Sequence, residues 1–300
     1  MDFQEKDERR SLRTGRFMKW NRRVFGILYP MNANWLGKFV YHVLPIRRKI
    51  VLENMKLAFG KRRSDAEIRE LAQAFYGHIA QVLLENVRMT WMSDAELMRS
   101  VKVIGADIAI RAHQKGNGII FMTGHFGNWE LAPIGGVMQF PQFKNRFFIL
   151  RRPIVNKWIE KLLFQRFYRC GLNIIPKRNS LDRVLDALEQ KHAVTFIMDQ
   201  YARPSKDGIL AEFFGVKTGT FKSLALVAAR THAPVVPVMC FRDAKGQHVM
   251  RFFEPLKWIK HDDADAEILE NTRQYNRTLE QMILSRPEQW LWFHRRWKQK

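Results

Sequence analysis

The chain has 300 residues, with 51 Lys and Arg against 29 Asp and Glu, which gives a formal net charge of +22. With 46% hydrophobic and 12% aromatic residues it can bury a large core, which excludes a disordered chain. The charge predicts anionic partners, and by itself it leaves open nucleic acid, an anionic lipid surface, a phosphorylated substrate or an acidic carrier protein.

The N-terminal stretch is charged and lacks the apolar core and cleavage site of a secretory signal, so we expect no export. Residues 24–46 are rich in large apolar side chains but are interrupted by Pro30 and Lys38. A spanning helix needs about 20 mostly apolar residues in a row. We therefore expect residues 1–46 to form a helical membrane-associating segment that lies on the surface, and the alternative is a helical hairpin buried in the domain.

Two capping boxes mark helix starts in the next part of the chain. The box at residues 64–67 opens a long helix over 65–89, and the box at 93–96 opens a short one. Apolar residues at helical spacing in the long helix, Leu83 among them, predict its buried stripe. His78 stands beside this stripe, and we expect it to be a packed helix residue and not a catalyst.

From residue 101 onward, short apolar runs alternate with helical patterns. This rhythm predicts an α/β fold, a mostly parallel sheet flanked by helices, in a single domain over residues 47–300. The expected strands are 101–104, 118–123, 146–150, 172–175, 194–198, 235–241 and an antiparallel strand 249–253. A short amphipathic helix that ends at Gly60 is expected within the basic stretch 47–63. The other expected helices, besides those opened by the capping boxes, are 106–115, 128–138, 154–169, 180–190, 220–231 and 262–284.

The stretch T-G-H-F-G-N-W-E at residues 123–130 follows an apolar strand, so His125 stands at a strand's carboxyl end, where parallel sheets collect ligands. Glycines on either side of Phe126 permit a sharp turn in which His125 meets Glu130. A carboxylate on one imidazole nitrogen leaves the other nitrogen to take a proton from a hydroxyl. We interpret His125 as a general base and Glu130 as its orienting partner, with the backbone N–H groups from Gly127 to Trp129 as a candidate oxyanion site. The alternative is a hydrogen-bonded histidine beside a helix cap.

Further polar residues follow other strand ends. Residues 144–178 contain ten Lys and Arg and one acidic residue. Fixed guanidinium groups suit phosphate, so Arg152 and Arg151 are candidate substrate ligands, and a solvated basic face is the alternative. Asp199 is expected to position substrate or the neighbours of His125, or to be a solvated loop residue. The candidate substrate-binding set is Arg152, Arg151, Asn128, Asp199 and Lys177.

The ordered set of motifs resembles the late acyltransferases of lipid A biosynthesis, the lauroyl and myristoyl transferases among the His-x4-Asp/Glu acyltransferases. Residues 123–130 match the active-site block, and Arg151-Arg152-Pro153 is similar to the family's Tyr-Arg-Pro. Further blocks lie at 174–177, 199–200, 213–215, 234–238, 287–292 and 295–298. Tyr201 stands where the family often has a second Asp, and Arg151 stands where the family often has Tyr. These two departures leave the identity of the acceptor open. The aromatic pair in block 213–215 is interpreted as an acyl-chain slot or as plain core.

The resemblance implies a glycerolipid-acyltransferase-like fold and a transfer of a fatty acyl chain from an acyl-carrier-protein or coenzyme A thioester to a hydroxyl of a phosphorylated lipid A precursor. Direct transfer needs no covalent serine, and the chain has no G-x-S-x-G. The alternative acceptor is a lysophospholipid or another amphiphilic alcohol. The expected place is the cytoplasmic face of a bacterial inner membrane, with the protein peripheral or shallowly anchored.

Two other classes of function remain as alternatives. A nucleic-acid-binding protein would fit the charge, but no helix-turn-helix, zinc or RNP-like motif accompanies it. A non-catalytic membrane scaffold would require that His125 and Glu130 do not touch. No metal-ligand cluster or phosphate-cradling glycine loop is visible, so we expect no metal and no cofactor. Cys170 and Cys240 lack metal spacing and are expected to be free buried thiols.

Overall fold

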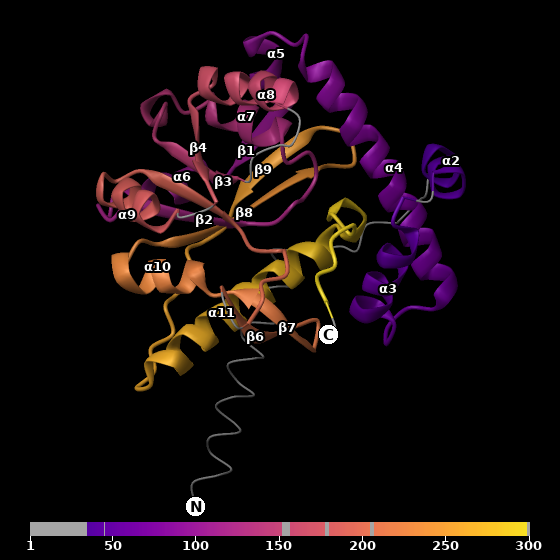
Figure 1. Ribbon diagram of the computed structural model, residues 1–300. Coiled ribbons are helices and arrows are strands. Elements are labelled where there is room, and N and C mark those ends of the chain that lie inside the picture. The colour runs from indigo at the N-terminus through magenta and orange to yellow at the C-terminus, as the bar shows by residue number, and fades with distance from the viewer. Residues whose placement is uncertain (1–34, 45, 152–156, 178–179, 205–206, 299–300) are drawn as a thin grey trace, which may run out of the picture.

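The computed structural model describes residues 35–44, 46–151, 157–177, 180–204 and 207–298. Its central layer is a seven-stranded sheet of order β1-β9-β8-β2-β5-β3-β4 (Figure 1). The strands are β1 (Val101–Ile104), β2 (Ile119–Thr123), β3 (Phe147–Arg151), β4 (Leu172–Pro176), β5 (Ala193–Ile197), β8 (Val235–Arg242) and β9 (His248–Phe252). Strands β8, β2, β5, β3 and β4 run parallel, and β9 is antiparallel to β8. The predicted mostly parallel α/β sheet is confirmed.

Alternate side chains of the central strand β2 enter two different cores. Ile120 and Met122 belong to one core, and Ile119 and Phe121 belong to the other, because successive side chains of a strand point to opposite faces. The first core is covered by α2 (Trp35–Val43), α3 (Arg48–Phe59), α4 (Asp65–Met89), α9 (Leu181–Glu189), α10 (Ser223–Thr231) and α11 (Ala264–Ser285). The second is covered by α5 (Asp94–Ser100), α6 (Ala106–His113), α7 (Leu131–Val137) and α8 (Lys157–Arg169).

Both capping boxes form as predicted. Ser64 accepts a hydrogen bond from the backbone N–H of Glu67, whose side chain accepts from the backbone N–H of Ser64. Ser93 and Glu96 make the same reciprocal pair at the start of α5. These bonds satisfy N–H groups that have no partner inside the helix, which is why both helix starts can be located from local sequence alone.

A two-stranded sheet of β6 (Gly208–Phe213) and β7 (Val216–Phe221) was not predicted. Its turn residues, Phe214 and Gly215, both have positive φ, as a two-residue hairpin turn requires. The buried guanidinium of Arg296 donates to the carbonyl oxygen of Gly219 at 2.8 Å, and burial lowers its pKa to about 10. Phe213 is fully buried against Trp290 and Trp297, so it is part of the core and not of an acyl-chain slot.

Most of the predicted membrane-associating segment, residues 1–34 and 45, lies outside the described residues. Its described part, α2, packs closely on α4, since a Cβ added at Gly37 would come within 2.3 Å of the carbonyl oxygen of Gln73. The domain boundary at residue 46 stays a prediction. None of the described helices is both long and apolar enough to cross a membrane.

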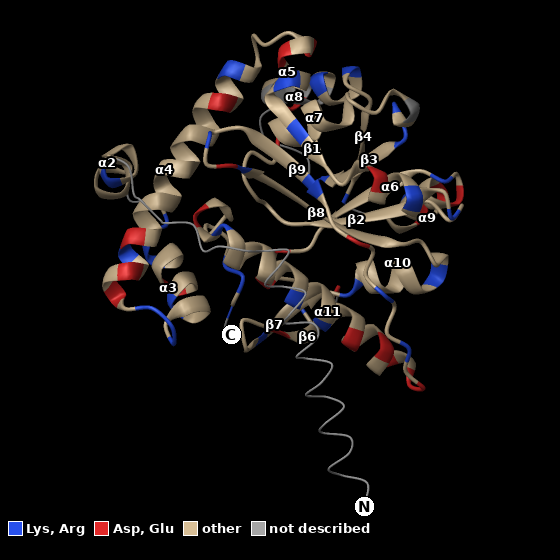
Figure 2. Ribbon diagram, turned by 180° about the vertical axis from the view of Figure 1, so that it is seen from behind, with Lys and Arg blue, Asp and Glu red and all other residues tan. Residues whose placement is uncertain are grey.

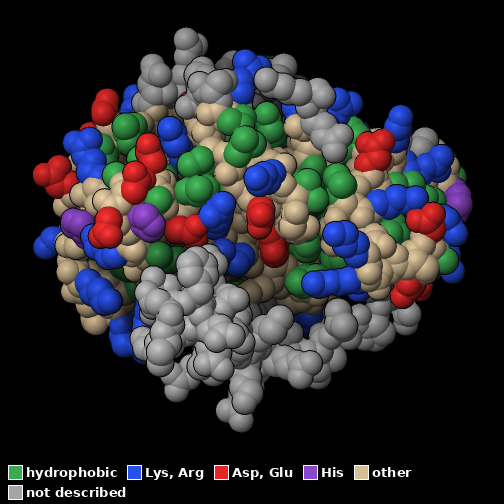
Figure 3. Space-filling model, turned by 90° about the horizontal axis from the view of Figure 1, so that it is seen from below, with side chains coloured by type: hydrophobic (Ala, Val, Ile, Leu, Met, Phe, Trp, Pro, Cys, Tyr) green, Lys and Arg blue, Asp and Glu red, His purple; other side chains and the backbone are tan. Residues whose placement is uncertain are grey.

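Charge is spread unevenly over the described elements. Viewed from behind, the middle of α4 is tan between coloured ends, because residues 71–84 contain no Lys, Arg, Asp or Glu (Figure 2). The face seen from below carries Lys and Arg interspersed with acidic and hydrophobic side chains, and not one continuous basic patch (Figure 3). The net charge therefore does not by itself mark a single binding face.

Candidate active site

His125 lies in the loop that joins β2 to α7, as the sequence predicted. The chain turns sharply at Gly127, whose φ is +55°, and a Cβ there would come within 2.7 Å of the carbonyl oxygen of Cys240. No other residue fits this position without moving the backbone of β8. The glycine therefore lets the loop pass tightly over β8 and carry His125 at the carboxyl end of β2.

The carboxylate that holds His125 is Asp199. Its Oδ1 lies 2.9 Å from His125 Nδ1, and its Oδ2 accepts the backbone N–H of His125 at 2.7 Å. The indole of Trp290 donates to the same Oδ2 at 3.0 Å. With Nδ1 engaged, Nε2 is the ring nitrogen that can take a proton.

Charge and burial act in opposite directions on this pair. Burial on its own would lower the pKa of His125, but the Asp199 carboxylate outweighs it and the net pKa is raised above the ordinary 6.5. Burial would likewise raise the pKa of Asp199, and the neighbouring His125 holds it well below its usual range. Asp199 therefore stays ionised beneath an imidazole that readily gains a proton.

Glu130, the predicted partner of His125, is bound elsewhere. Its two carboxylate oxygens accept hydrogen bonds from the two terminal nitrogens of Arg151, both at 2.8 Å. The expected Glu130–His125 hydrogen bond is thus replaced by Asp199–His125, although Glu130 is close enough to contribute to the raised pKa of His125. The prediction failed because a partner 74 residues away takes Nδ1.

The C-terminal block anchors the same loop from a second side. The backbone N–H of Gly127 donates to the carbonyl oxygen of Gln289, the last residue of the 3₁₀ helix η2 (Pro287–Gln289), at 2.9 Å. The N–H of Leu291 donates to the carbonyl oxygen of His125 at 3.0 Å. The Gly127 N–H, expected to form part of an oxyanion site, is therefore already occupied.

Asn128 is a structural residue of the loop. Its side-chain oxygen accepts the N–H groups of Glu130 and Leu131 at the start of α7, and its amide nitrogen donates to Glu85 of α4 at 3.0 Å. Only 1% of Asn128 is exposed. These contacts fix the helix start and do not support the predicted substrate-binding role of Asn128.

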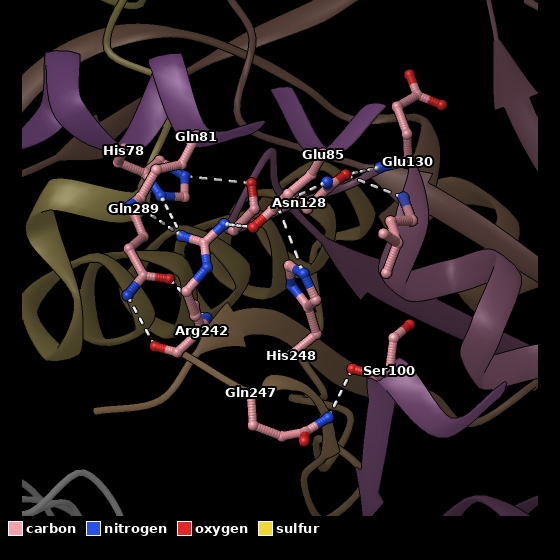
Figure 4. Close-up of polar contacts among 12 residues, drawn as sticks. His78, Gln81, Glu85, Ser100, Asn128, Glu130, Arg242, Gln247, His248 and Gln289 are labelled. Atoms are coloured by element: carbon pink, nitrogen blue, oxygen red, sulfur yellow. Dashed lines mark hydrogen bonds and ion pairs between the residues drawn. The ribbon is translucent and has the colours of Figure 1, made fainter. Parts of the chain in front are cut away.

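A cluster of charged and polar residues lies on the other side of the loop, and we call His78, Glu85, Asn128, Arg242 and His248 the Glu85 cluster (Figure 4). Arg242, at the end of β8, forms an ion pair with Glu85 and donates to His78 Nδ1 at 3.2 Å. His78 Nε2 in turn lies 3.3 Å from the carbonyl oxygen of Gly127, so it donates there. Burial, followed by the Arg242 charge, lowers the pKa of His78 to about 3.

The sequence alone did not indicate a role for Glu85, Arg242 or His248. His78 was predicted to be a packed helix residue, and it is 5% exposed. A polar stripe at residues 78, 81 and 85 of a helix with an otherwise apolar inner face is the signal that would have found the cluster. Together with η2, the Glu85 cluster anchors the loop that carries His125 from behind.

A cavity of about 260 Å³ opens in front of His125. Its apolar lining residues include members of β3, β5 and β7, and its polar lining residues include Arg151, Lys177 and Gln200. The lining residues are His125, Leu150, Arg151, Lys177, Phe196, Ile197, Met198, Gln200, Phe221 and Ser223. A polar group facing His125 and an apolar chain can thus enter the same space.

The remaining predicted site residues divide in two. Lys177 lines the cavity with its Nζ 3.9 Å from the centre of the Phe221 ring, so it provides positive charge at the wall. Arg152 lies outside the described residues, and its role stays a prediction.

No group of His, Cys, Asp and Glu in the described ranges is arranged to hold a metal ion. Cys170 and Cys240 are free and buried, as predicted.

The profile of the family described as bacterial lipid A biosynthesis acyltransferase matches residues 30–299. The chain belongs to this family. It is similar to two lipid A biosynthesis enzymes of Escherichia coli K12. The palmitoleoyltransferase is 26% identical over 266 residues, which cover 88% of this chain and 82% of the relative. The lauroyltransferase is 24% identical over 276 residues, which cover 91% of this chain and 86% of the relative. The resemblance stated from the motifs is confirmed, and the protein is an acyltransferase.

Two more distant similarities accompany these. A phosphatidylinositol mannoside acyltransferase of Mycolicibacterium smegmatis is 23% identical over 201 residues, 64% of this chain and 62% of that protein. The crystal structure of a 1-acyl-sn-glycerophosphate acyltransferase from Thermotoga maritima covers 81% of this chain and 94% of its own with 16% identity and a TM-score of 0.34. Membership of an acyltransferase family decides against the nucleic-acid and scaffold interpretations.

Proposed function

We propose that this lipid A biosynthesis acyltransferase moves a fatty acyl chain from an acyl-carrier-protein or coenzyme A thioester to a hydroxyl of a phosphorylated lipid A precursor, with His125 as general base. The observation that carries the proposal is the Asp199–His125 pair beside a cavity that is lined by both polar and apolar residues. Asp199 fixes the tautomer in which Nε2 accepts a proton.

In the proposed reaction, the acceptor hydroxyl gives its proton to His125 Nε2 as its oxygen attacks the thioester carbonyl carbon. The C–S bond then breaks, and the departing thiolate takes the proton back from the imidazolium. No covalent enzyme intermediate is needed, because the acceptor attacks directly. The raised pKa of His125 favours the imidazolium that forms in the first step.

Arg151 has the position to stabilise the negative charge that develops on the carbonyl oxygen. Arg151 lines the cavity, and the two hydrogen bonds to Glu130 fix the orientation of its guanidinium. A cation that is already oriented reduces the reorganisation needed in the transition state. In this scheme Glu130 acts through Arg151, and Asp199 acts through His125.

The cavity volume limits how much of the substrates it holds. About 260 Å³ lies just below the 300–1,000 Å³ of pockets that enclose a drug-sized ligand. It therefore accommodates the reacting groups and the first part of one acyl chain, next to Leu150, Phe196 and Met198. The remainder of an amphiphilic acceptor stays outside, which fits the proposed reaction at the cytoplasmic face of a membrane.

The test is an assay with purified protein, both thioester donors and a lipid A precursor that carries free hydroxyls. We expect mass spectrometry to show the precursor heavier by one acyl group, and no such product with His125→Ala. A second acceptor is favoured by the relative that acts on a phosphatidylinositol mannoside. Transfer to that glycolipid or to a lysophospholipid, with none to the lipid A precursor, would contradict the proposed acceptor and leave the chemistry intact.

A further inference from the structure

In its second half, helix α4 turns the polar residues His78 and Glu85 inward and exposes apolar residues on its outer side. His78 and Glu85 point inward to the loop of the active site, where they bind the Gly127 carbonyl and the Asn128 amide. Leu83 and Val87 are each two residues from Glu85, or about 200° around the helix, so they point outward. The helices of a water-soluble domain normally show the reverse arrangement.

The outward side chains are exposed to a degree that is unusual for their type. Leu83 is 62% exposed, Leu84 65%, Val87 56%, and Trp91, just beyond the helix end, 78%. The spacing of 84, 87 and 91 forms a continuous stripe along the second half of α4. The sequence interpretation placed Leu83 in the core, and that assignment was wrong, because helical spacing reveals an apolar stripe but not the side on which it is covered.

Helix α2, which packs on the same helix near Gln73 and Gly77, carries a second group of exposed apolar side chains. There Trp35 is 77% exposed, while Phe39 and Val43, one turn apart, are both 55% exposed. Both views show α2 and α4 at the same edge of the molecule (Figure 1, Figure 2). We call this set of side chains the α2–α4 face: Trp35, Phe39, Val43, Ile46, Leu83, Leu84, Val87 and Trp91.

We propose that the α2–α4 face is the surface on which the protein rests in the headgroup and upper acyl region of an anionic lipid bilayer. The charges around it favour this occupant, since residues 35–52 include Lys38, Arg47, Arg48 and Lys49 and no Asp or Glu. Trp35 and Trp91 are its most exposed members, and tryptophan is enriched at the depth of lipid headgroups. By contrast, the face in Figure 3 mixes charges of both signs with apolar residues.

The proposed membrane contact rests on the proposed function in one respect: its role would be to bring a lipid acceptor to His125. The inner side of α4 holds the His125 loop through Glu85 and Asn128, at 3.0 Å. One helix therefore separates the bilayer contact from the reaction loop.

The first experiment measures binding of the full-length protein to vesicles of phosphatidylglycerol and phosphatidylcholine, without any substrate. The variant Leu83→Gln/Leu84→Gln/Val87→Gln changes the α4 stripe, and Leu181→Gln/Leu210→Gln/Leu226→Gln is its matched control, since these leucines are 52%, 56% and 45% exposed on other elements. At high salt, where electrostatic attraction is screened, the α4 variant should bind at least about tenfold more weakly. The control should bind as the wild type does.

Equal binding of the wild type and both variants would overturn the proposal. An equal loss in both variants would do the same, because the effect would then follow surface polarity in general. Circular dichroism should show that all three proteins are folded. Vesicle binding is measured without any acyl transfer. A wild-type protein that binds vesicles but transfers no acyl group would therefore count against the proposed function and not against the membrane contact.

A second experiment reports on position 87 itself. Cys170 and Cys240 are buried, so Val87→Cys can be labelled with an environment-sensitive fluorophore, and Leu226→Cys serves as control. Vesicles should shift the emission of the label at 87 to the blue, and brominated lipids should quench it, with neither effect at 226. If residues 1–34 cover the face, the label at 87 will be insensitive to vesicles until those residues are deleted, and that outcome would overturn the proposal.

Discussion

His125 and His78 lie on opposite sides of one loop and are both largely buried, yet their environments differ in charge. The His125 ring faces the Asp199 carboxylate, and its net pKa is raised. The His78 ring faces the Arg242 guanidinium, and burial together with that charge lowers its pKa to about 3. The sign of the neighbouring charge, and not the degree of burial, decides which of them can exchange a proton near neutral pH.

The comparison separates a chemical role from a positioning role. His125 can change its protonation state during a reaction, which a general base requires. His78 stays neutral, and its tautomer is fixed because Nδ1 accepts from Arg242 while Nε2 donates to the Gly127 carbonyl. We therefore expect substitutions at His125 to affect turnover and substitutions at His78 to affect the stability of the loop.

The largest effect is expected for His125→Ala. Loss of a general base lowers turnover by roughly 10²- to 10⁴-fold. The melting temperature should fall, because the buried Asp199 carboxylate loses its imidazole partner, so turnover is compared at a temperature at which both proteins are folded. The measurement is kcat with saturating donor and acceptor, and turnover close to that of the wild type would remove His125 from the mechanism.

Asp199→Asn should come close to that loss, because an amide that donates to Nδ1 moves the imidazole proton to Nε2 and blocks the base. The pH profile gives a sharper test. In the wild type His125 is protonated and inactive at low pH, so kcat/KM should rise with pH through an apparent pKa above 6.5. In Asp199→Asn the residual activity should show this inflection at lower pH. An unchanged inflection would mean that Asp199 does not tune His125.

Arg151→Ala comes next, with a loss of about 10²- to 10³-fold if the guanidinium stabilises the oxyanion. Glu130→Gln should cost less, because the Arg151 charge remains and only its orientation is loosened. Its pH inflection should move less than that of Asp199→Asn, since Asp199 affects the pKa of His125 more than Glu130 does. If Glu130→Gln moved the inflection further, Glu130 would be the orienting partner after all.

The fold was largely predictable because its signals are local. Capping boxes, apolar runs and glycines indicate where elements begin and end, and the strands and α4 lie within a few residues of their expected bounds. The β6–β7 hairpin was missed because its strands contain two glycines and charged residues, which are weak strand formers.

The partner of His125 depends on which strands are neighbours, and spacing along the chain does not give this. In the sheet, Thr123 of β2 pairs with Ile197 of β5. His125 and Asp199 each come two residues later, at equivalent positions of adjacent strands, and therefore meet. The order of the sheet would have to be known before Asp199 could be preferred to Glu130, which is only five residues from His125.

His78→Leu should lower the free energy of unfolding by about 1–3 kcal/mol, the cost of leaving a buried polar group unpaired. Here both the Gly127 carbonyl and Arg242 lose a partner. His78→Gln keeps an N–H donor near the position of Nε2 and should recover part of the loss. Urea unfolding at neutral pH measures both, and equal losses in the two variants would mean that packing and not the hydrogen bond matters.

The smallest effect is a difference in the pH dependence of stability. The folded pKa of His78 is about 3, below the ordinary 6.5, so the unfolded chain binds a proton that the native state does not. The contribution of His78 to unfolding free energy should therefore decline as pH falls from 6.5 toward 3. His125, whose folded pKa is raised, should contribute stability below 6.5 that disappears as pH rises through its folded pKa. The measured quantity is the unfolding free energy of the wild type minus that of His78→Gln or His125→Gln at each pH. The His78 difference should decline as pH falls below 6.5, and the His125 difference should decline as pH rises above 6.5. If the His78 difference is flat between pH 6.5 and 3, His78 is charged in the native state. Its Nδ1 would then carry a proton and could not accept a hydrogen bond from Arg242.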